Sequence, residues 1–472
     1  MAEVQSNWAA LPVQSRLKVL AAARSLLAER AQDLLTEDGG LSARLPLEAL
    51  SSEVLPLLAA MRFLEASAGK VLRPRKLGRS GLPLWMSGLH SEVHRVALGK
   101  VLVIGPSNYP LFLPGVQVVQ ALAAGNAVIW KPGLGGGKIA NTFAEIMRSA
   151  GLPDGLLSVT DESVPAAERS IADGVDKVFL TGSAASGRAL LRQLAERLIP
   201  AVVELSGCDA VVVLPGADLH RVVQALSFGM RLNGSCTCMA PRRLFYVGAT
   251  PEQKRHLAEA LLAAFRTIAP VTLTGATRQR LAALLKDAQA EGACIHGGLA
   301  DEGVMPILVE DGSARMAVAQ EDIFAPVITM IEAADIDAVL AAQELCPFGL
   351  TASLFGNEDE CRTLAGRLDV GSVFINDLIF PSADPRVPFS GRRLSGFGVT
   401  QGIEGLLEMT AVKTISVQRS SKLSHYGQPK PAQVGLLLAV IQSMYARTLR
   451  SRLGGMVQTI REGRQLRRSD SA

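Results

Sequence analysis

Two cysteines lie two positions apart in a short segment that suits a turn. Cys236 and Cys238 belong to Asn233–Arg243, which consists mostly of small and polar residues. A cysteine is a useful nucleophile only as the thiolate, which requires a positive local field or a nearby base. The alternative is that both side chains are small apolar fillers of the core, as isolated cysteines usually are. The segment therefore predicts a candidate covalent site in which either thiol could react.

Two polar side chains that follow apolar runs could serve such a thiol. Glu204 ends the run Pro200–Glu204, and Asn108 follows the run Val101–Gly105 and precedes a helical pattern. Open α/β sheets present their functional groups at the carboxyl ends of strands. The Glu204 carboxylate could act there as a general base on water, and the Asn108 amide could donate to an oxyanion. The alternatives are a solvated carboxylate at a strand end and a helix cap.

The segment Thr181–Gly187 has the same strand–turn–helix context and is rich in glycine and serine. Backbone N–H groups at such a helix start suit a phosphate. The segment does not match G-x-G-x-x-G, so it is weak support for a nucleotide site when taken alone. A metal site is not predicted, because the Cys-Thr-Cys pair has no second Cys or His pair at ligand spacing.

The elements that must position these residues alternate between short apolar runs and helical patterns. Continuous apolar runs of this length are typical of buried parallel strands. Strand–helix alternation of this kind predicts a doubly wound sheet with right-handed crossovers. In the first half the predicted strands are Val101–Gly105, Ala127–Lys131, Leu157–Val159, Lys177–Leu180 and Pro200–Glu204, and the predicted helices are Leu111–Ala124, Ile139–Ala150 and Gly187–Leu198.

The remaining parts of the chain show weaker patterns. Residues 8–67 are predicted to be mostly helical, because leucines recur at intervals of three and four. Residues 80–100 are predicted to form an extended excursion. Residues 206–400 repeat the alternation less regularly and predict a second α/β domain. Its predicted strands are Ala210–Leu214, Arg243–Val247, Met305–Leu308, Val327–Ile331 and Val373–Ile375, and its predicted helices are Leu219–Arg231, Pro251–Ala264, Arg278–Gln289 and Glu358–Leu368.

The composition fits a soluble enzyme with a small-molecule substrate. The 472 residues are enough for two or three domains, and 48% of them are apolar but only 4% aromatic. The net charge is +4, of which the segment from Ser421 onward contributes +7 through nine Lys/Arg and two Asp/Glu, which leaves about −3 elsewhere. Nucleic acid is therefore not predicted as a partner. The N-terminus shows no apolar signal segment, and six scattered cysteines suit a reducing, cytoplasmic compartment.

Several motifs in a fixed order resemble those of the aldehyde dehydrogenase superfamily over roughly residues 10–420. Their number and order make the resemblance far more specific than any single motif. In chain order they are Gly-Pro-Ser-Asn-Tyr-Pro, Ala-Leu-Ala-Ala-Gly-Asn-Ala-Val-Ile-Trp-Lys-Pro, Phe-Leu-Thr-Gly-Ser, Val-Glu-Leu-Ser-Gly, Cys-Thr-Cys-Met-Ala-Pro, Gln-Glu-Asp-Ile-Phe-Ala-Pro-Val, Pro-Phe-Ser-Gly and Ser-Gly-Phe-Gly. The resemblance implies an α/β fold with a Rossmann-type doubly wound cofactor domain, an α/β catalytic domain and a small β excursion for oligomerisation.

The resemblance implies that Cys238 is the nucleophile, although the cysteine motif departs from the family pattern. The family has Gly-Gln-x-Cys, whereas Ser235 stands at the glycine position here and Gly234 comes one place early. Cys238 is favoured because Met-Ala-Pro-x-Arg follows it, and because its separation from Glu204, 238 − 204 = 34, matches the family. Cys236 then replaces a glutamine, either as a filler or as a redox partner.

The residues that the family uses for its cofactor carry over less completely. Lys131 matches a ribose-contacting lysine, but the glutamate that normally follows three places later is Leu134 here. Asp322 stands where the family has a ribose-binding glutamate, and Phe324 is retained. Loss of a carboxylate near the adenosine 2′-hydroxyl removes repulsion against a 2′-phosphate, so NADP is expected as well as NAD. The turn residues implied to lie at the cofactor are Gly182, Ser183 and Gly187.

The implied reaction is NAD(P)-dependent oxidation of an aldehyde to a carboxylic acid. The Cys238 thiolate attacks the carbonyl, the Asn108 amide and the Cys238 N–H stabilise the oxyanion, and Glu204 activates the water that releases the acid. The residues implied to flank the substrate are Tyr109, Leu113, Thr237 and Met239. Their mostly apolar character suits a hydrophobic aldehyde.

Two other functions stay open at this point. One is a CoA-acylating dehydrogenase, in which CoA takes the acyl group instead of water, although the retention of Glu204 disfavours it. The other is a catalytically silent member of the family that serves as a scaffold, which the off-pattern residues Ser235, Leu134 and Asp322 keep open.

The resemblance also divides the chain into parts and favours a homodimer. The expected parts are an NAD(P)-binding domain at 1–79 and 100–205, a catalytic domain at 206–407, oligomerisation strands at 80–99 and 408–420, and a basic tail at 421–472. The tail departs from the family, so its role must be inferred from its own residues.

The tail has an amphipathic and basic pattern. Val434–Ile441 is an apolar run too short to span a bilayer, which takes about 20 residues. A basic amphipathic helix over 430–468 could lie on the anionic inner face of a membrane. The alternative is a helix that docks on the protein and ends in a basic segment. The apolar face continues through Met444, Tyr445, Leu449 and Leu453, and the basic residues are Arg447, Arg450, Arg452, Arg461, Arg464, Arg467 and Arg468.

Overall fold

The computed structural model describes the chain except for residues 43, 84, 85, 87, 302, 422–425, 427, 429, 432 and 470–472. The side chains of Arg467 and Arg468, which belong to the predicted basic tail, lie outside the described part. The chain forms two compact units, one made of Met1–Arg75 with Val93–Thr414 and the other of Lys76–Glu92 with Ile415–Ala472. Each unit is described by itself.

The first sheet of the large unit has the strand order β19-β7-β6-β3-β4-β5. Its strands are parallel except for β19, which pairs antiparallel to β7. The structure confirms all five strands that the apolar runs predict in the first half of the chain. Their bounds are β3 Lys100–Ile104, β4 Ala127–Lys131, β5 Leu157–Val159, β6 Lys177–Thr181, β7 Ala201–Glu204 and β19 Gly396–Phe397.

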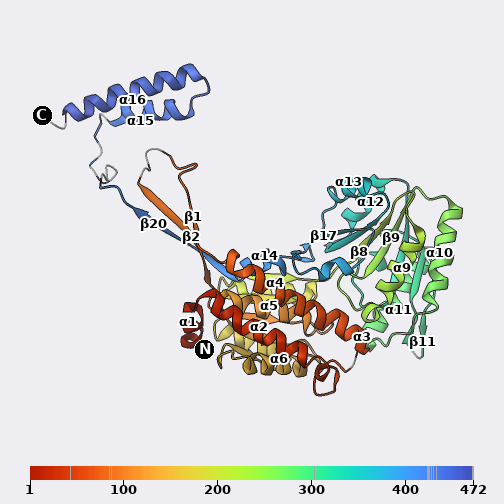
Figure 1. Ribbon diagram of the computed structural model, residues 1–472. Coiled ribbons are helices and arrows are strands. Elements are labelled where there is room, and N and C mark those ends of the chain that lie inside the picture. The colour runs from red at the N-terminus through yellow and green to blue at the C-terminus, as the bar shows by residue number, and fades with distance from the viewer. Residues whose placement is uncertain are drawn as a thin grey trace. The chain divides into compact units, whose positions relative to one another are not determined.

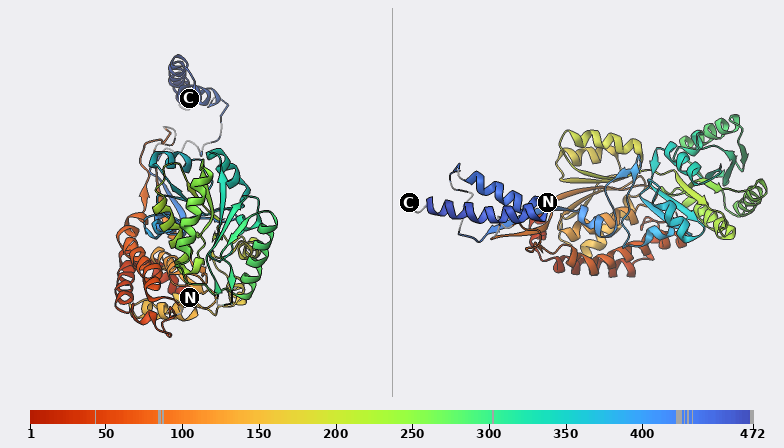
Figure 2. Two further views of the ribbon diagram at one scale, coloured as in Figure 1. Left: turned by 90° about the vertical axis from the view of Figure 1, so that its right-hand side faces the viewer. Right: turned by 90° about the horizontal axis from the view of Figure 1, so that it is seen from above.

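Helices cover both faces of this sheet. Val101 and Val103 of β3 face a core built with α2, α4, α5 and α6, whereas Leu102 and Ile104 face α7 and α8. Figure 2 shows the red and orange N-terminal helices on one side of the sheet and the yellow helices on the other. The sequence patterns missed α7. The bounds are α2 Val13–Glu29, α4 Leu55–Val71, α5 Phe112–Ala124, α6 Gly137–Ser149, α7 Val164–Ala172 and α8 Ala184–Ala195.

The N-terminal helical region contains a π-helical turn. Leu50–Val54 forms this turn between α3 (Pro46–Ala49) and α4. Pro56 follows directly and has no N–H to donate to the carbonyl four residues earlier, so a regular α-helical ladder cannot pass through this point. Such turns are frequent at functional sites. The region begins with α1 (Ala2–Ala10).

The second sheet of the large unit has the order β10-β13-β14-β9-β8-β16-β17 and is parallel apart from β10. The sequence patterns missed β16, whose Thr-Ala-Ser-Leu-Phe stretch carries small residues where a buried strand usually carries Val or Ile. They also placed β13 two residues early. The bounds are β8 Asp209–Val213, β9 Pro241–Val247, β10 Cys294–His296, β13 Ile307–Gly312, β14 Val327–Ala333, β16 Thr351–Phe355 and β17 Ser372–Ile375.

This sheet is also covered on both faces. Val211 and Val213 of β8 contact the core under α9 and α10, and Ala210 and Val212 contact the core under α12 and α13. Figure 1 shows α12 and α13 on the opposite side of the sheet from α9 and α10. The sequence patterns missed α12. The bounds are α9 Leu219–Arg231, α10 Pro251–Phe265, α11 Gly275–Ala290, α12 Ile336–Leu345 and α13 Glu358–Ala365. Helix α14 (Gly402–Glu408) packs instead in the core of the first sheet through Leu406.

The small unit contains part of a sheet of order β1-β2-β20 and a helical hairpin. The predicted extended excursion contains a strand, β2. The tail forms two helices rather than one, and Gly455 lets them approach, because a Cβ there would lie 2.5 Å from the Ser443 nitrogen. Among the described residues, no helix is both long and apolar enough to cross a bilayer. The bounds are β1 Arg75–Lys76, β2 Leu89–Ala97, β20 Thr410–Gln418, α15 Gln433–Tyr445 and α16 Leu449–Ser469.

Candidate active site

The topology creates a crevice at one edge of the first sheet. From β3 the chain continues to β4 and β5 on one side, and then returns to add β6 and β7 on the other. In open α/β sheets, ligands bind outside the carboxyl ends of the strands at such a switch point. Asn108 follows β3, Thr181 ends β6 and Glu204 ends β7. The sheet therefore brings these predicted site residues to one edge.

The cysteine segment is a tight turn between α9 and β9. Asn233, Gly234 and Ser235 have φ values of 50°, 60° and 61°. Three consecutive left-handed residues are unusual and fit a sharp reversal of the chain. A Cβ at position 234 would lie 2.8 Å from Cγ1 of Val271, so glycine suits this position on steric grounds as well. The structure thus confirms the predicted turn.

A buried arginine binds this turn through hydrogen bonds. Arg242 Nη1 donates to the Ser235 hydroxyl at 2.9 Å and to the Ala325 carbonyl at 2.6 Å, and Nη2 donates to the Ser235 carbonyl at 2.8 Å. Its Nε lies 3.8 Å from a carboxylate oxygen of Asp322, whose side chain is only 3% exposed. Asp322 is therefore placed beside Arg242 in the interior.

Cys238 and Glu204 lie against each other in the interior. Both are buried, and the loop after Glu204 passes so close that a Cβ at Gly207 would lie 2.5 Å from the Cys238 carbonyl oxygen. Burial raises the pKa of Glu204 to about 7, although hydrogen bonding to the Cys238 thiol and the Thr181 hydroxyl opposes the rise. Burial, with the carboxyls of Glu204 and Asp209, raises the pKa of the Cys238 thiol well above its ordinary value. The Cys238 thiol is therefore protonated at neutral pH.

Asn108 reaches the same turn from the first sheet. Its Nδ2 donates to the Cys236 carbonyl at 2.9 Å, and Asn233 Nδ2 donates to the Asn108 carbonyl at 3.1 Å. A carboxamide nitrogen carries two hydrogens, so a second one is left to donate elsewhere. The Cys236 thiol, which is partly exposed, donates to the Phe324 carbonyl at 3.7 Å. The Asn108 amide is therefore bonded to the carbonyl of Cys236, two residues before Cys238.

The predicted substrate residues do not all lie equally close to this turn. The Tyr109 hydroxyl forms a 2.7 Å hydrogen bond with the Thr237 hydroxyl. Met239 packs with Cys238 in a small apolar cluster that also contains Leu350 and Phe389. Leu113 lies in the first turn of α5 and packs against the core of the first sheet. Sequence reasoning missed Leu350 and Phe389, of which only Phe389 falls in a recognisable motif, Pro-Phe-Ser-Gly.

Comparison with known proteins is consistent with this geometry. The model of the aldehyde dehydrogenase family matches residues 1–415. The chain belongs to the aldehyde dehydrogenase family. It is 30% identical to the 4,4'-diapolycopene aldehyde oxidase of Methylomonas sp over 85% of this chain and 77% of that protein. It is 28% identical to the betaine aldehyde dehydrogenase of Brucella melitensis over 90% and 89% of the two chains.

Solved structures give the same result. The Mycobacterium tuberculosis aldehyde dehydrogenase complexed with NAD+ matches with a TM-score of 0.78 at 26% identity, over 88% of each chain. The Staphylococcus aureus betaine aldehyde dehydrogenase matches in fold with a TM-score of 0.82 at 20% identity, over 91% and 90% of the two chains. The enzyme is thus an NAD(P)-dependent aldehyde dehydrogenase that oxidises an aldehyde to the acid. The predicted fold is confirmed.

Three of the predicted cofactor residues of this dehydrogenase, Lys131, Gly182 and Ser183, lie at the same sheet edge, whereas Asp322 and Phe324 belong to the loop before β14. Lys131 ends β4, and burial lowers the pKa of its ammonium, while Glu162 and Asp161 oppose the shift. Ser183 caps α8 by accepting from the Ser186 N–H, and Gly182 leaves space over the turn, because a Cβ there would meet no atom closer than 3.5 Å. An ammonium group, a helix start and open space fit the phosphates and ribose of a dinucleotide.

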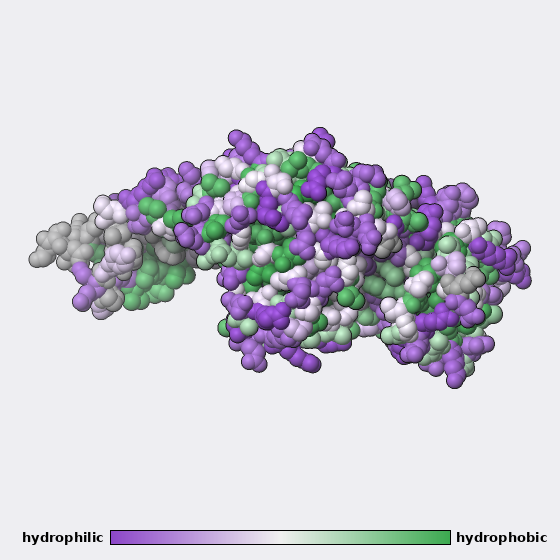
Figure 3. All heavy atoms as spheres, turned by 90° about the horizontal axis from the view of Figure 1, so that it is seen from below, coloured by the Kyte–Doolittle hydropathy of each residue, from purple (hydrophilic) through white to green (hydrophobic). Residues whose placement is uncertain are grey.

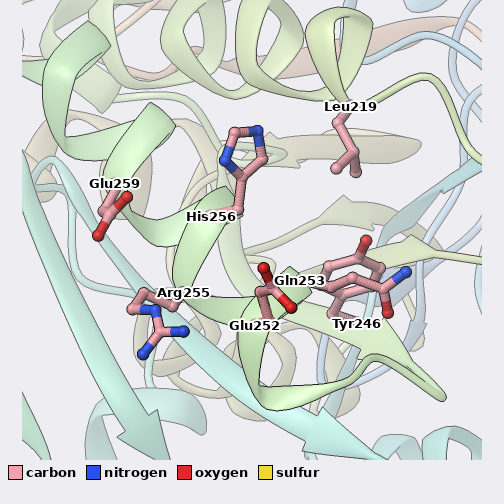
Figure 4. A pocket seen from close by; sticks show the side chains of 7 residues that line it. All are labelled: Leu219, Tyr246, Glu252, Gln253, Arg255, His256 and Glu259. Carbon is pink, nitrogen blue, oxygen red and sulfur yellow. The ribbon is translucent and has the colours of Figure 1, made fainter.

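One hollow on the catalytic half of the dehydrogenase lies away from the Cys238 turn. It has a volume of about 400 Å³ and lies where α9 begins, β9 ends and α10 begins. Because Cys238 precedes the start of β9, this hollow is at the opposite end of that strand from the thiol. The side chains that line it, shown in Figure 4, are Leu219, Tyr246, Glu252, Gln253, Arg255, His256 and Glu259.

Proposed function

We propose that Cys238 is the nucleophile of this aldehyde dehydrogenase and that Glu204 is its general base. The observation that carries the proposal is the buried contact between the Cys238 thiol and the Glu204 carboxyl at the sheet edge. A carboxyl whose pKa is about 7 can both accept and release a proton near neutral pH. Cys236 forms no such contact with Glu204 among the described interactions, so it is the weaker candidate.

The reaction then proceeds in balanced steps. Glu204 accepts the thiol proton, and the Cys238 sulfur bonds to the aldehyde carbon to give a thiohemiacetal. The free N–H of the Asn108 amide and the Cys238 backbone N–H stabilise the oxyanion. Loss of hydride leaves a thioester on Cys238. Glu204 then loses the thiol proton to solvent and so regains its carboxylate. It next removes a proton from water, whose oxygen attacks the thioester carbon, and it returns that proton to the departing Cys238 sulfur as the acid leaves.

The nicotinamide cofactor, when bound, accepts the hydride. Lys131 would bind the ribose, and the turn of Gly182 and Ser183 at the start of α8 would bind the diphosphate. Gly187, also predicted as a cofactor residue, lies inside α8, where a Cβ would lie 2.7 Å from Cδ1 of Leu205. Phe324 would border the nicotinamide. Asp322 stays a predicted ribose contact, although its position beside Arg242 gives it a second role inside the protein. The chain therefore supplies position and field, and the cofactor supplies the redox chemistry.

We also propose that the substrate is a hydrophobic aldehyde. Met239, Leu350 and Phe389 pack with Cys238, and these side chains offer no charge to a polar substrate. The hydroxyls of Tyr109 and Thr237 bond to each other. A relative at 30% identity is named for a diapolycopene aldehyde. An apolar pocket binds longer alkyl chains more tightly by about 0.8 kcal/mol per buried methylene.

A panel of aldehydes tests these proposals. We expect kcat/KM to rise with chain length, and a preference for short charged aldehydes would contradict the hydrophobic assignment. Cys238→Ala should abolish NAD(P)H formation, whereas Cys236→Ala should retain most of it. The reverse pattern would identify Cys236 as the nucleophile. Equal rates for wild type and Cys238→Ala would favour the silent scaffold, and acyl-CoA formation with added CoA would favour the acylating alternative.

Cofactor preference is tested separately. Leu134 is 79% exposed and uncharged where the family has a glutamate, which favours acceptance of NADP as well as NAD. Steady-state rates with both cofactors should lie within about tenfold of each other, since one lost carboxylate repulsion is worth about 1 kcal/mol. A strong preference for NAD would refute this. Leu134→Glu should then reduce the rate with NADP and leave the rate with NAD unchanged.

The tail hairpin supports a peripheral membrane role. Its exposed apolar residues follow a helical spacing of three and four on each helix, and Figure 3 shows apolar side chains gathered on one face of the hairpin. Liposomes of anionic and neutral lipid test the proposal with the full chain and with a chain that ends at residue 429. Equal pelleting of the two chains would contradict it. The exposed apolar residues of the hairpin are Val434, Leu437, Leu438, Ile441 and Tyr445 on α15, and Leu449, Leu453, Met456, Val457 and Ile460 on α16.

We further propose a homodimer bridged by residues 80–99 and 408–420, with cofactor and catalytic domains at 1–79 with 100–205 and at 206–407. The strand β20 in this bridging region exposes Val412, Ile415 and Val417, which favours burial against a second copy. Light scattering after size exclusion tests the mass, and a monomer at all concentrations would contradict the proposal.

A further inference from the structure

A buried glutamate on the π-helical turn holds the start of helix α5. Glu53 is 0% exposed, and its Oε2 accepts from the Leu111 N–H at 3.1 Å and from the Phe112 N–H at 2.7 Å. Leu111 is the N-cap residue of α5, and its own side chain makes no capping bond. Glu53 therefore caps α5 from another part of the chain, in place of the local Ser, Thr or Asp that usually does so.

An arginine fixes this carboxylate. Arg44 Nη1 lies 3.3 Å from Glu53 Oε1, and the Arg44 side chain is 13% exposed. Its guanidinium also lies over the ring of Tyr109, 5.1 Å from the ring centre. Burial raises the pKa of Glu53 to about 7, while the charge of Arg44 and the two backbone N–H groups lower it. Burying the Glu53 carboxyl opposes its ionisation, so packing alone does not explain why an acid occupies this position.

The residues that Glu53 holds lie immediately after the predicted oxyanion donor. Asn108 and Tyr109 precede Leu111 by three and two positions, with Pro110 between them and the N-cap. Asn108 donates to the Cys236 carbonyl, and Tyr109 bonds to Thr237, so each touches a neighbour of Cys238. A chain of contacts thus runs from the π-helical turn through the start of α5 to Cys236 and Thr237, the two residues before Cys238.

We propose that Glu53, held by Arg44, is a positioning residue for the reaction: it fixes the start of α5 and thereby the Asn108 amide relative to Cys238. The inference rests on the proposed roles of Asn108 and Cys238. Glu53 touches neither substrate nor cofactor in this role and acts through Asn108. Small misplacements of a reacting group cost up to about a hundredfold in rate, so the effect should be measurable.

A double-mutant cycle tests the proposal. Glu53→Gln keeps the shape of the side chain but places an amide beside Arg44, and it should lower kcat/KM for the aldehyde about 10- to 100-fold. Asn108→Ala should lower it about 100- to 1,000-fold. Because Glu53 acts through Asn108, the double variant should be within about twofold of Asn108→Ala. The KM for the cofactor should stay within about twofold throughout, and rates should be normalised to the amplitude of the NAD(P)H burst.

Arg16→Gln is the matched structural control. Arg16 is buried and donates to the Ala123 carbonyl at 3.0 Å at the other end of α5. Its loss should lower the melting temperature, leave kcat unchanged and combine multiplicatively with Asn108→Ala. If Glu53→Gln does not fold, Arg44→Gln takes its place in the cycle, with a smaller loss and the same lack of additivity.

The double-mutant cycle distinguishes the positioning role of Glu53 from the proposed oxyanion role of Asn108. Multiplicative losses for Glu53→Gln and Asn108→Ala, or Glu53→Gln with unchanged kcat/KM, would overturn the positioning role and leave the proposed function intact. Full activity of Asn108→Ala would instead overturn the oxyanion role in the proposed function. Non-additive losses support the inference, because a general loss of stability would not depend on whether the Asn108 amide is present.

Discussion

Replacing Glu204 by glutamine should have opposite effects on activity and on stability. The pKa of Glu204 is raised from 4.5 to about 7 by burial. A raised pKa means that the folded state binds the proton more tightly than the unfolded state does, so this stabilisation is fully present below pH 4.5 and is lost as the pH rises through about 7. The rise corresponds to about 3 kcal/mol. Glu204→Gln removes that cost of ionisation, so at pH 8.5 the variant should be more stable than wild type by up to this amount.

The activity should change in the other direction. Because the variant lacks the proposed general base, thioester hydrolysis should slow about 100- to 10,000-fold, and the pH dependence near 7 should disappear. Urea unfolding at pH 4 and pH 8.5 measures stability, and stopped-flow absorbance of NAD(P)H separates the hydride step from hydrolysis. The stability difference between variant and wild type should be small at pH 4 and large at pH 8.5.

Glu145→Gln is the control, because Glu145 is a solvent-exposed acid in the middle of helix α6. It should change neither the unfolding free energy at either pH nor the rate of hydrolysis by more than the error. Equal stability of Glu204→Gln and wild type at pH 8.5 would refute the claim that an ionised carboxylate is buried at this site. Retained hydrolysis in the variant would refute its role as the base.

Three further predictions concern the turn that carries Cys238. Gly234→Ala should cost about 1–2 kcal/mol and lower kcat, since φ is 60° and the new Cβ would lie 2.8 Å from Val271; adding Val271→Ala should return only the steric part in urea unfolding. Ser235→Ala and Ser235→Gly both lose the hydroxyl that Arg242 binds, but the glycine variant should be about 1 kcal/mol more stable, because φ is 61° there; equal stabilities would argue against backbone strain. Arg242→Met should cost about 3–5 kcal/mol, because it removes the ion pair of the buried Asp322 and three hydrogen bonds to Ser235 and Ala325, and adding Asp322→Leu should recover only the electrostatic part in the same assay.

The strands of the first sheet could be predicted because their apolar runs are continuous and end in clear turns. Val101–Ile104 is buried on both faces, and in Ala127–Trp130 only Ile129 is partly exposed, which is the condition under which such runs form. The strand β16 could not be predicted, because its small and hydroxyl residues are buried by neighbouring strands rather than by their own hydrophobicity. Strands made of large apolar residues can therefore be predicted from the sequence. Strands made of small and hydroxyl residues are missed, because only the neighbouring strands and helices bury them.

The candidate site divides in the same way. Cys238, Glu204 and Asn108 could be singled out because each follows or precedes a recognisable strand or turn. Glu53 could not, because nothing in its local sequence shows that it caps a helix 58 residues away. Arg242 adjoins a family motif, yet its function depends on the loop that carries Ala325. Residues that act across the fold leave no local signal.

The surroundings of Cys238 determine how its thiol must be activated. Many reactive cysteines lie in an electropositive field that holds them as thiolates. Here burial comes first, and then the carboxyls of Glu204, Asp209 and Asp322 all raise the pKa of Cys238. A field of this sign stabilises the thiol, so the proposed reaction forms the thiolate by proton transfer to a neighbour at the moment of attack. Glu204 is the carboxyl in hydrogen-bonding contact, and its pKa of about 7 matches that task. In the proposed reaction the same carboxyl that later activates water must therefore also start the reaction by accepting the thiol proton.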